Sequence, residues 1–184
     1  MNRLRGPAVL VVCLALVAVL NGFRETGIAQ TRSYLAGADG WAHAPSASGF
    51  VHRARLARGL LRPTIEEPLL TDAVFVVIEL EVQVRDRALP LSTLTLETTD
   101  GYRYSQLTDA GLAGLSLTQP GWTSYGTAVF EVPPQRVPGA RLVVGAQSDM
   151  LVIYRAQLAF DAVVSDFTVH DRVAITPARS EVTR

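Results

Sequence analysis

The amino-acid sequence predicts an all-β protein, an antiparallel β-sandwich preceded by one N-terminal transmembrane or signal helix. Two observations predict the sandwich. Apolar side chains recur at every second position in several segments after residue 48, which is the period of strands with one face on a core. Gly, Pro and Asp clusters separate these segments at short intervals, as in sandwiches. A third observation, an apolar run that follows two arginines, predicts the helix.

The N-terminal helix is predicted from the run at residues 7–23, which has 17 residues and no charge. A signal peptide has an apolar core of about 7 to 15 residues, and a membrane span needs about 17 to 25. Gly27-Ile28-Ala29 offers a small-residue cleavage site, but its distance from the run favours an uncleaved anchor over a removed signal peptide. In both cases Arg3 and Arg5 stay cytoplasmic and the remainder is exported. The expected location is therefore the cell membrane, with a single span and the C-terminal domain outside, and the alternative is secretion after cleavage.

The exported part has no strong electrostatic bias. All 17 basic residues of the chain are arginine, and 17 acidic residues balance them. Without residues 1–30 the chain keeps 14 basic and 16 acidic groups, so nothing predicts a nucleic-acid partner. The one cysteine, Cys13, lies in the apolar run, so the exported part has no disulfide.

Four regions are expected along the chain. Residues 1–23 form the anchor or signal peptide, and residues 24–48, rich in Gly, Ala and Ser, form a linker. Residues 49–176 form the sandwich domain. Residues 177–184 form a polar tail.

The first expected strand spans residues 49–60. Simple alternation places its side chains on two faces: Val51, Arg53 and Arg55 on one, and Phe50, His52, Ala54 and Leu56 on the other.

Residues 73–86 show the strongest strand pattern. Every even position is apolar from Val74 to Val84, whereas the odd positions pass from Phe75 and Val77 to Glu79, Glu81 and Gln83. One face of this strand is expected to be core throughout, and the other is expected to leave the core halfway along.

Turn residues divide the rest of the chain. Asp100-Gly101 predicts a hairpin between two short strands, and Pro120-Gly121 predicts a turn before a strand at residues 122–132. Pro133-Pro134 must end that strand because proline has no N–H for a sheet ladder. The chain is then expected to cross to the other sheet, turn at Pro138-Gly139, and add further strands over 140–146 and 151–164 and an edge strand within 166–177.

Three of these segments, FVVIELEVQVRD, LETTDGYRYSQL and LTQPGWTSYGTAVFEVP, resemble in that order an Ig-like domain of unknown function from bacterial lipoproteins and membrane-anchored proteins. The secreted immunoprotective antigens of mycobacteria are similar in architecture. The resemblance covers roughly residues 49–160. It implies an immunoglobulin-like sandwich on the outer side of a membrane and no particular activity.

Four residues resemble the corner of such a sandwich, where a tyrosine hydroxyl donates to backbone a few residues upstream. They are Leu117, Pro120, Gly121 and Tyr125. Tyr125 is then structural, and the alternative is an exposed tyrosine that binds a partner.

Groups capable of catalysis are scarce, and no hydrolase, zinc or phosphate-binding motif occurs. The best metal candidates are Asp161, Asp166, His170 and Asp171, but in a strand Asp171 points away from Asp166 and His170. A charged edge strand accounts for them better. We therefore expect no enzyme and no cofactor.

A possible interaction surface comprises Arg53, Arg55, Arg58, Tyr102 and Tyr104. Cross-strand ion pairs of Arg53 and Arg55 with Glu79 and Glu81 account for the arginines, and binding of an anionic partner is the alternative. The predicted function is that of a non-enzymatic, membrane-tethered, extracytoplasmic Ig-like module that acts through contacts with a membrane or envelope protein, as an accessory to a transporter or envelope assembly. The alternative is a secreted small-ligand or metal-binding protein.

Overall fold

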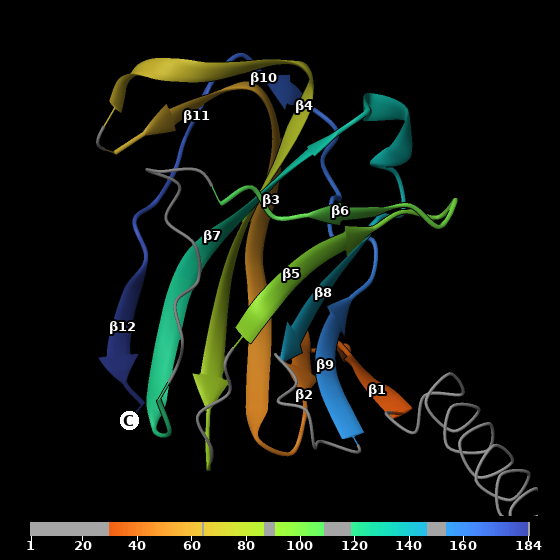
Figure 1. Ribbon diagram of the computed structural model, residues 1–184, viewed down its shortest axis with the longest axis vertical. Coiled ribbons are helices and arrows are strands. Elements are labelled where there is room, and N and C mark those ends of the chain that lie inside the picture. Colours follow the sequence, from red (N-terminus) through yellow and green to blue (C-terminus); the bar gives the residue numbers. More distant parts are fainter. Residues whose placement is uncertain (1–29, 64, 87–90, 109–118, 147–153, 184) are drawn as a thin grey trace, which may run out of the picture.

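Two β-sheets packed face to face make up the protein (Figure 1). The computed structural model describes residues 30–63, 65–86, 91–108, 119–146 and 154–183. One sheet has the strand order β1-β9-β8-β5-β6, and the other has the order β10-β3-β4-β7-β12, with β2 and β11 also paired to β3. The all-β sandwich prediction is thus confirmed. No helix within the described ranges has the length and apolar character needed to span a bilayer, and the predicted N-terminal helix lies outside those ranges.

The five-stranded sheet contains β1 (Gln30–Leu35), β5 (Leu91–Glu97), β6 (Arg103–Ser105), β8 (Arg141–Ala146) and β9 (Tyr154–Phe160). The seven-stranded sheet contains β2 (Trp41–His43), β3 (Ala47–Arg62), β4 (Ile65–Val84), β7 (Trp122–Val132), β10 (Val169–His170), β11 (Val173–Ala174) and β12 (Arg179–Val182).

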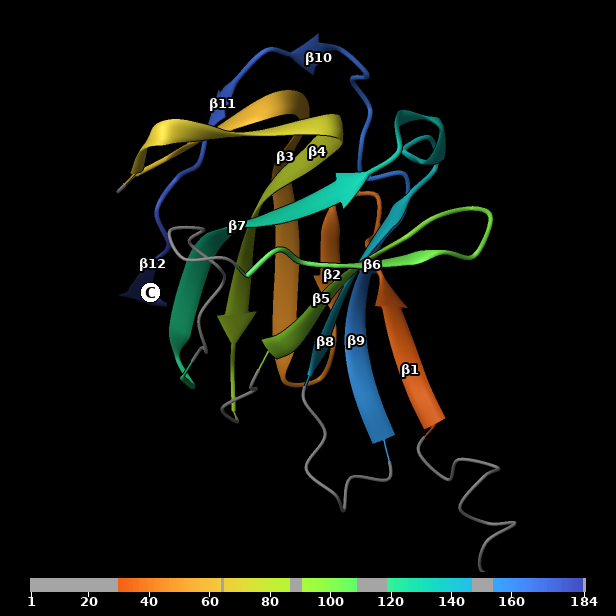
Figure 2. The same ribbon diagram turned by 45° about the horizontal axis from the view of Figure 1, so that its top comes forward.

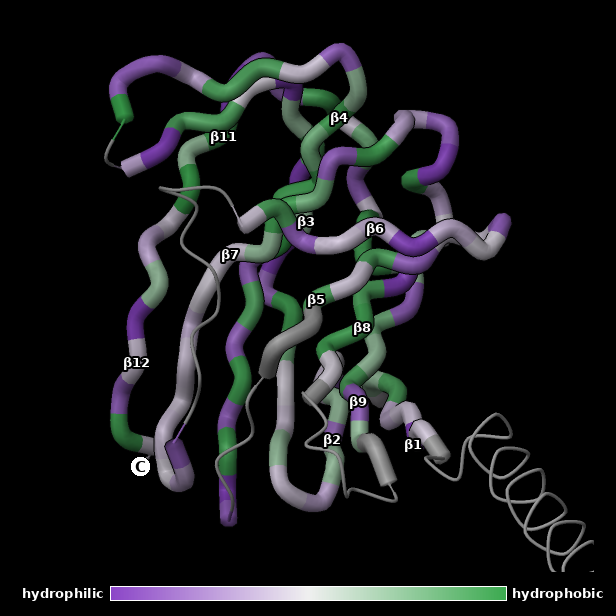
Figure 3. Tube along the Cα trace, viewed as in Figure 1, coloured by the Kyte–Doolittle hydropathy of each residue, from purple (hydrophilic) through white to green (hydrophobic). Residues whose placement is uncertain are grey.

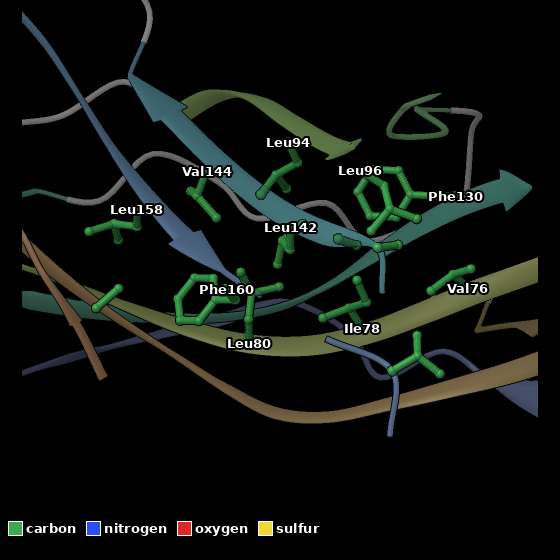
Figure 4. Close-up of a cluster of buried hydrophobic side chains, with 14 of the residues drawn as sticks. Val76, Ile78, Leu80, Leu94, Leu96, Phe130, Leu142, Val144, Leu158 and Phe160 are labelled. Atoms are coloured by element: carbon green, nitrogen blue, oxygen red, sulfur yellow. The ribbon is translucent and has the colours of Figure 1, made fainter. Parts of the chain in front are cut away.

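The main core lies between the two sheets (Figure 4). The even-numbered side chains of β4 from Val74 to Val84 face inward, and none is more than 2% exposed. They pack with Phe130 of β7, Leu142 of β8 and Phe160 of β9. Each such side chain contributes about 1.5–3 kcal/mol by leaving water. The predicted continuous core row is confirmed.

The chain changes sheets at the double proline, as predicted. β7 ends at Val132, a 3-10 turn (η1, Pro134–Arg136) follows, and β8 begins in the other sheet. Gly139 supports the turn with φ at 73°, a value that glycine adopts without strain.

The hairpin predicted at Asp100-Gly101 is also present. β5 and β6 pair in antiparallel fashion from Thr95 opposite Ser105 to Glu97 opposite Arg103. Gly101 has φ at 86°, and its N–H donates to the carbonyl oxygen of Thr98 at 3.0 Å.

Residues 30–48 were expected to be part of a linker, and that expectation is wrong. They form β1, β2 and the start of β3. β1 lies beside β9 at the sheet edge (Figure 2) and runs parallel to it, so the sandwich is not wholly antiparallel. Edge strands bury little, and most side chains of β1 are exposed, so its composition resembles that of a linker. The expected polar tail likewise contains β12, which pairs with β7.

A β-bulge corrects the predicted faces of β3. Val51 lies opposite Leu80 and Arg53 lies opposite Glu79, so His52 is an extra residue without an opposite partner. As a result Val51 shares the inner side with Ala54 and Leu56, whose partners are the inward residues of β4. Phe50, Arg53 and Arg55 share the outer side.

A second, smaller apolar cluster covers part of the outer face of the seven-stranded sheet. Phe75, Val77 and Val129 pack there against Val173 and Ile175 from the C-terminal segment. Hydrophobic residues of β11 and of the adjoining end of β3 are visible in Figure 3. The odd-numbered face of β4 therefore leaves the apolar interior after Val77, as predicted.

Candidate contact face of the seven-stranded sheet

The outer face of the seven-stranded sheet has two halves of different character. The upper half, around Phe75 and Val77, is sealed by the C-terminal segment. The lower half begins at Glu79 of β4 and carries aromatic and charged side chains, most of which are exposed or half-buried. We call this lower half the contact face.

Register places one line of side chains across five strands of this face. Trp41 of β2 lies opposite Phe50 of β3, and Phe50 lies opposite Glu81 of β4. Glu81 lies opposite Tyr125 of β7, and Tyr125 lies opposite Arg179 of β12. Side chains directly opposite each other are close enough to interact, so the line is continuous.

Four rings in and beside this line form the aromatic row, defined as Trp41, Phe50, His52 and Tyr125. Ring centroids are 5.3 Å apart for Trp41 and Phe50, 5.0 Å for Phe50 and His52, and 6.3 Å for His52 and Tyr125. These spacings are within the range of favourable ring contacts. The bulge makes the row possible, because it lets His52 reach the side that carries Phe50.

Glu81 is the buried acid beneath the row, with 7% of the residue exposed. Its Oε2 lies 3.1 Å from Nε2 of His52, and its Oε1 accepts from the side chain of Gln83 at 3.5 Å. This contact is a hydrogen bond in the tautomer of His52 that carries the hydrogen on Nε2, because a carboxylate can only accept. This bond orients the His52 ring between Phe50 and Tyr125.

The arginine pairs predicted on β3 form around one acid instead of two. Arg53 donates to both carboxylate oxygens of Glu79 at 3.0 and 3.1 Å, and Arg55 donates to its Oε1 at 2.6 Å. Glu81, the second predicted partner, pairs with His52. Arg58 donates to the backbone carbonyl oxygens of Asp72 and Ala73, so it holds β4 and does not join the contact face.

Tyr125 stands at the centre of the face, and its hydroxyl donates to Oε1 of Glu181 at 2.8 Å. That bond, helped by burial and by the charge of Glu81, raises the pKa of Tyr125 to about 12. The guanidinium of Arg179 lies over the ring, 4.5 Å from its centroid. The predicted corner bond to upstream backbone is therefore wrong. Pro120 and Gly121 form the predicted turn, with φ of Gly121 at 76°, and Leu117 lies outside the described residues.

Two open grooves flank Tyr125. One, of about 600 Å³, runs from His52 and Glu79 past Tyr125 to residues 176–179. The other, of about 690 Å³, lies between Gln83 and Thr123 on one side and residues 181–183 on the other. Both are within the size range of small-ligand sites, and both are bordered by β12 or by the residues just before it.

Tyr102 and Tyr104, the other predicted surface residues, lie on the β5–β6 hairpin of the other sheet, Tyr104 in β6 and Tyr102 just before it. The guanidinium of Arg136 lies 3.5 Å from the ring centroid of Tyr102 and donates to the hydroxyl of Tyr104 at 2.9 Å. It also pairs with Asp100 at 2.9 Å. The two tyrosines thus fasten the β5–β6 hairpin to the 3-10 turn, and they do not meet Arg53, Arg55 or Arg58.

The predicted metal residues are dispersed. Asp161 pairs with Arg141, and Asp166 accepts the backbone N–H of Thr168 at 2.9 Å, which lowers the pKa of Asp166. His170 lies in β10 beside β3, and Asp171 lies in the segment that follows. Within the described part of the chain, no three His, Cys, Asp or Glu side chains are grouped to bind a metal ion.

Sequence reasoning missed one grouping of Asp, His and Ser. Nδ1 of His43 lies 2.9 Å from Oγ of Ser48, and its Nε2 lies 3.7 Å from Asp39. The order of groups is that of a serine nucleophile with its base. However, Ser48 is only 2% exposed, and its Oγ already accepts from Arg85 at 3.0 Å. The Ser48 hydroxyl is thus buried and bonded to both His43 and Arg85, and these contacts link the two strands of the β2–β3 hairpin.

Comparisons with known proteins add no function. No protein-family model matches the chain, and no curated protein is similar to it in sequence. Two solved structures are similar in fold. An uncharacterized β-sandwich protein from Clostridium difficile 630 has 12% identity and a TM-score of 0.43, over 72% of this chain and 95% of that one. The secreted protein MPT63 from Mycobacterium tuberculosis has 15% identity and a TM-score of 0.43, over 72% and 97%. The resemblance to the Ig-like family stays a prediction.

Proposed function

We propose that this protein is a non-enzymatic, exported binding module that uses its contact face to hold a membrane or envelope protein. The observation that carries the proposal is the aromatic row, set among charged side chains on one half of a sheet face whose other half is sealed. Trp, Tyr and Arg supply most of the binding energy in protein interfaces. In this protein the side chains of the aromatic row and Arg179 contact one another in the absence of a partner.

The charge pattern of the face favours a protein over a polyanion as partner. Arg53, Arg55 and Arg179 are balanced by Glu79, Glu81 and Glu181. A nucleic acid or acidic polymer requires an excess of positive charge, whereas mixed charges give a protein partner its register and specificity.

Site-specific photo-crosslinking in the native host tests this proposal. A photoreactive amino acid at Phe50 is expected to give one discrete protein adduct in the membrane fraction. The matched control position is Thr95, on β5 of the other sheet. An equal adduct from Thr95, or no adduct from Phe50, contradicts the proposal. In the protein that carries the photoreactive amino acid at position 50, Tyr125→Ala is expected to reduce the amount of the crosslinked adduct.

The absence of hydrolase activity is tested at Ser48. A fluorophosphonate probe, which labels activated serines, is expected to leave the folded protein unmodified because the Ser48 hydroxyl is buried. Labelling that disappears in Ser48→Ala would show that Asp39, His43 and Ser48 act as a catalytic group.

The tether is tested separately. Mass spectrometry of the protein from the membrane fraction is expected to find a chain that begins at Met1. A mature chain that begins near Gln30 and is found in the medium rejects the anchor and favours the secreted alternative.

A further inference from the structure

We infer that β12 is a replaceable strand, and that an extended segment of the partner takes its place on the edge of β7. This inference rests on the proposed function, because it names how the partner engages the contact face. It concerns a different element, the C-terminal strand, and it can fail by itself.

The first observation is that β12 buries nothing of its own. All four of its residues are exposed, and Val182 is 63% exposed. Its neighbour β7, in contrast, places Ala128, Phe130 and Val132 in the core. Within the described residues, β12 is held by backbone bonds and polar side-chain contacts, and such segments open before the core of a sheet does.

The second observation is that β7 carries buried polar groups that β12 satisfies. Ser124 is 1% exposed, and its Oγ lies 2.8 Å from Oγ of Ser180. Thr123 is also buried, and its Oγ1 lies 3.0 Å from Oγ1 of Thr183. Buried hydroxyls and backbone groups are costly to leave without partners. Whatever replaces β12 must therefore be another extended chain that forms the same ladder.

The third observation is that β12 also covers the centre of the contact face. Glu181 accepts a hydrogen bond from the Tyr125 hydroxyl, and the guanidinium of Arg179 lies over the Tyr125 ring. The two grooves on either side of Tyr125 give an incoming chain room beside the strand. The occupant that fits is an antiparallel strand with a hydroxyl residue opposite Ser124 and an acidic residue next to it, as in Ser180-Glu181. This mode of recognition adds a strand to a sheet edge.

A reversible lock on β12 tests the inference in the full chain. Trp122 and Val182 are opposite each other. The next residues along the ladder, Thr183 and Gly121, form a hydrogen-bonded pair, because the Thr183 N–H donates to the Gly121 oxygen at 2.8 Å. Hydrogen-bonded and non-hydrogen-bonded pairs alternate along an antiparallel ladder, so Trp122 and Val182 form a non-hydrogen-bonded pair. Cα atoms of such pairs are about 4.5 Å apart, which a disulfide can bridge. The test protein carries Trp122→Cys and Val182→Cys, which leave Ser124 in place, with Cys13→Ser to prevent other pairing, and is used oxidised and reduced.

The probe is a fluorescent peptide with the sequence of residues 177–184, and the readout is its anisotropy. The reduced protein is expected to bind it, and the oxidised protein is expected to bind it at least about tenfold more weakly, because the lock removes the open state. A peptide with Ala at the positions of Ser180 and Glu181 is expected to bind more weakly to the reduced protein. Equal binding to both redox forms, or no binding to either, overturns the inference.

Photo-crosslinking at Phe50 in the locked protein separates the two proposals. An adduct that forms in the reduced protein and is lost in the oxidised protein supports strand replacement. An adduct that persists in the oxidised protein overturns strand replacement and leaves the contact face in place. Loss of the adduct in both forms, with peptide exchange intact, refutes the proposed function alone.

Discussion

Tyr125 shows how one side chain can link three strands. It stacks against His52 of β3, lies under Arg179 of β12 and donates to Glu181. Since its pKa is raised to about 12, the hydroxyl stays protonated and remains a donor at neutral pH. At this scale the contact face is already organised without a partner.

The pKa of Tyr125 provides a test of this link. Because its pKa in the folded state is above the ordinary value of 10.0, the bond to Glu181 stabilises the fold fully below pH 10. That stabilisation is lost as the pH rises from 10 through about 12. Glu181→Ala is expected to lower the pKa toward 10, measured by absorbance at 295 nm against Tyr125→Phe. Glu97→Ala, which removes an ion pair with Arg103 in the other sheet, is the control and is expected to leave it unchanged.

Gly49 is required by the close approach of the two sheets. A Cβ at this position would lie 2.8 Å from Cδ1 of Leu158 and 3.2 Å from Cζ of Phe160. Gly49→Ala is therefore expected to lower the free energy of unfolding by roughly 1–3 kcal/mol, measured by urea denaturation. Ser33→Ala, on the exposed part of β1, is expected to change it by less than about 0.5 kcal/mol. Unchanged stability in Gly49→Ala would show that the sheets separate easily.

At the scale of elements, the bulge in β3 decides which side chains reach the contact face. A regular ladder that included His52 would place Phe50 and Arg53 on opposite sides. With His52 as an extra residue, Phe50 and Arg53 share the outer side while Val51 and Ala54 face the core. The bulge thus reconciles two segments of β3 whose alternation is out of phase.

Deletion variants test this role. Deleting His52 is expected to keep the fold, because the remaining residues of β3 retain their opposite partners. The losses are the bond to Glu81 and the ring contacts with Phe50 and Tyr125. Deleting Ala54 instead is expected to unfold the protein or destabilise it by several kcal/mol, since it moves Arg53 into the core side. Far-UV circular dichroism and urea midpoints distinguish the two. Similar loss in both variants would contradict the assignment of His52 as the extra residue.

At the scale of the whole molecule, the C-terminal segment does two different things along one sheet face. Its first part, with Val173 and Ile175, closes the second apolar cluster, and its last part, β12, adds an exposed polar strand. Burial differs sharply between them, with Ile175 at 4% and Val182 at 63% exposed. The first part is therefore part of an apolar core, whereas the last part contributes almost no buried apolar surface.

Truncating one side chain in each part tests this division. Ile175→Ala is expected to cost about 2–5 kcal/mol of unfolding free energy, because it opens a cavity against Phe75 and Val77. Val182→Ala is expected to change stability by less than about 0.5 kcal/mol. Thermal and urea unfolding measure both. A comparable cost for the two variants would show that β12 is part of the core and would weaken the case for its replacement.

Much of the fold follows from local pattern. The core row of β4, the hairpin at Gly101 and the end of β7 before Pro133 each depend on residues within one short segment, and all three are confirmed. β1 and β12 were not predicted as strands. Edge strands bury few side chains, so neither sequence shows a strong alternation of apolar and polar residues. The contact face was predicted only in part: Arg53 and Arg55 belong to it, whereas Arg58, Tyr102 and Tyr104 do not.

The sequence by itself determined that this chain forms a two-layer β protein, because alternation and turn chemistry are local properties that a strand carries wherever it pairs. Only the tertiary structure decided which side chains from different strands are neighbours. The aromatic row brings together residues as distant in the sequence as Trp41 and Tyr125. The residue that accepts the hydrogen bond of the Tyr125 hydroxyl, Glu181, is distant in the sequence as well. Register and a one-residue bulge set these contacts, and both depend on how separate strands fit together across a shared core.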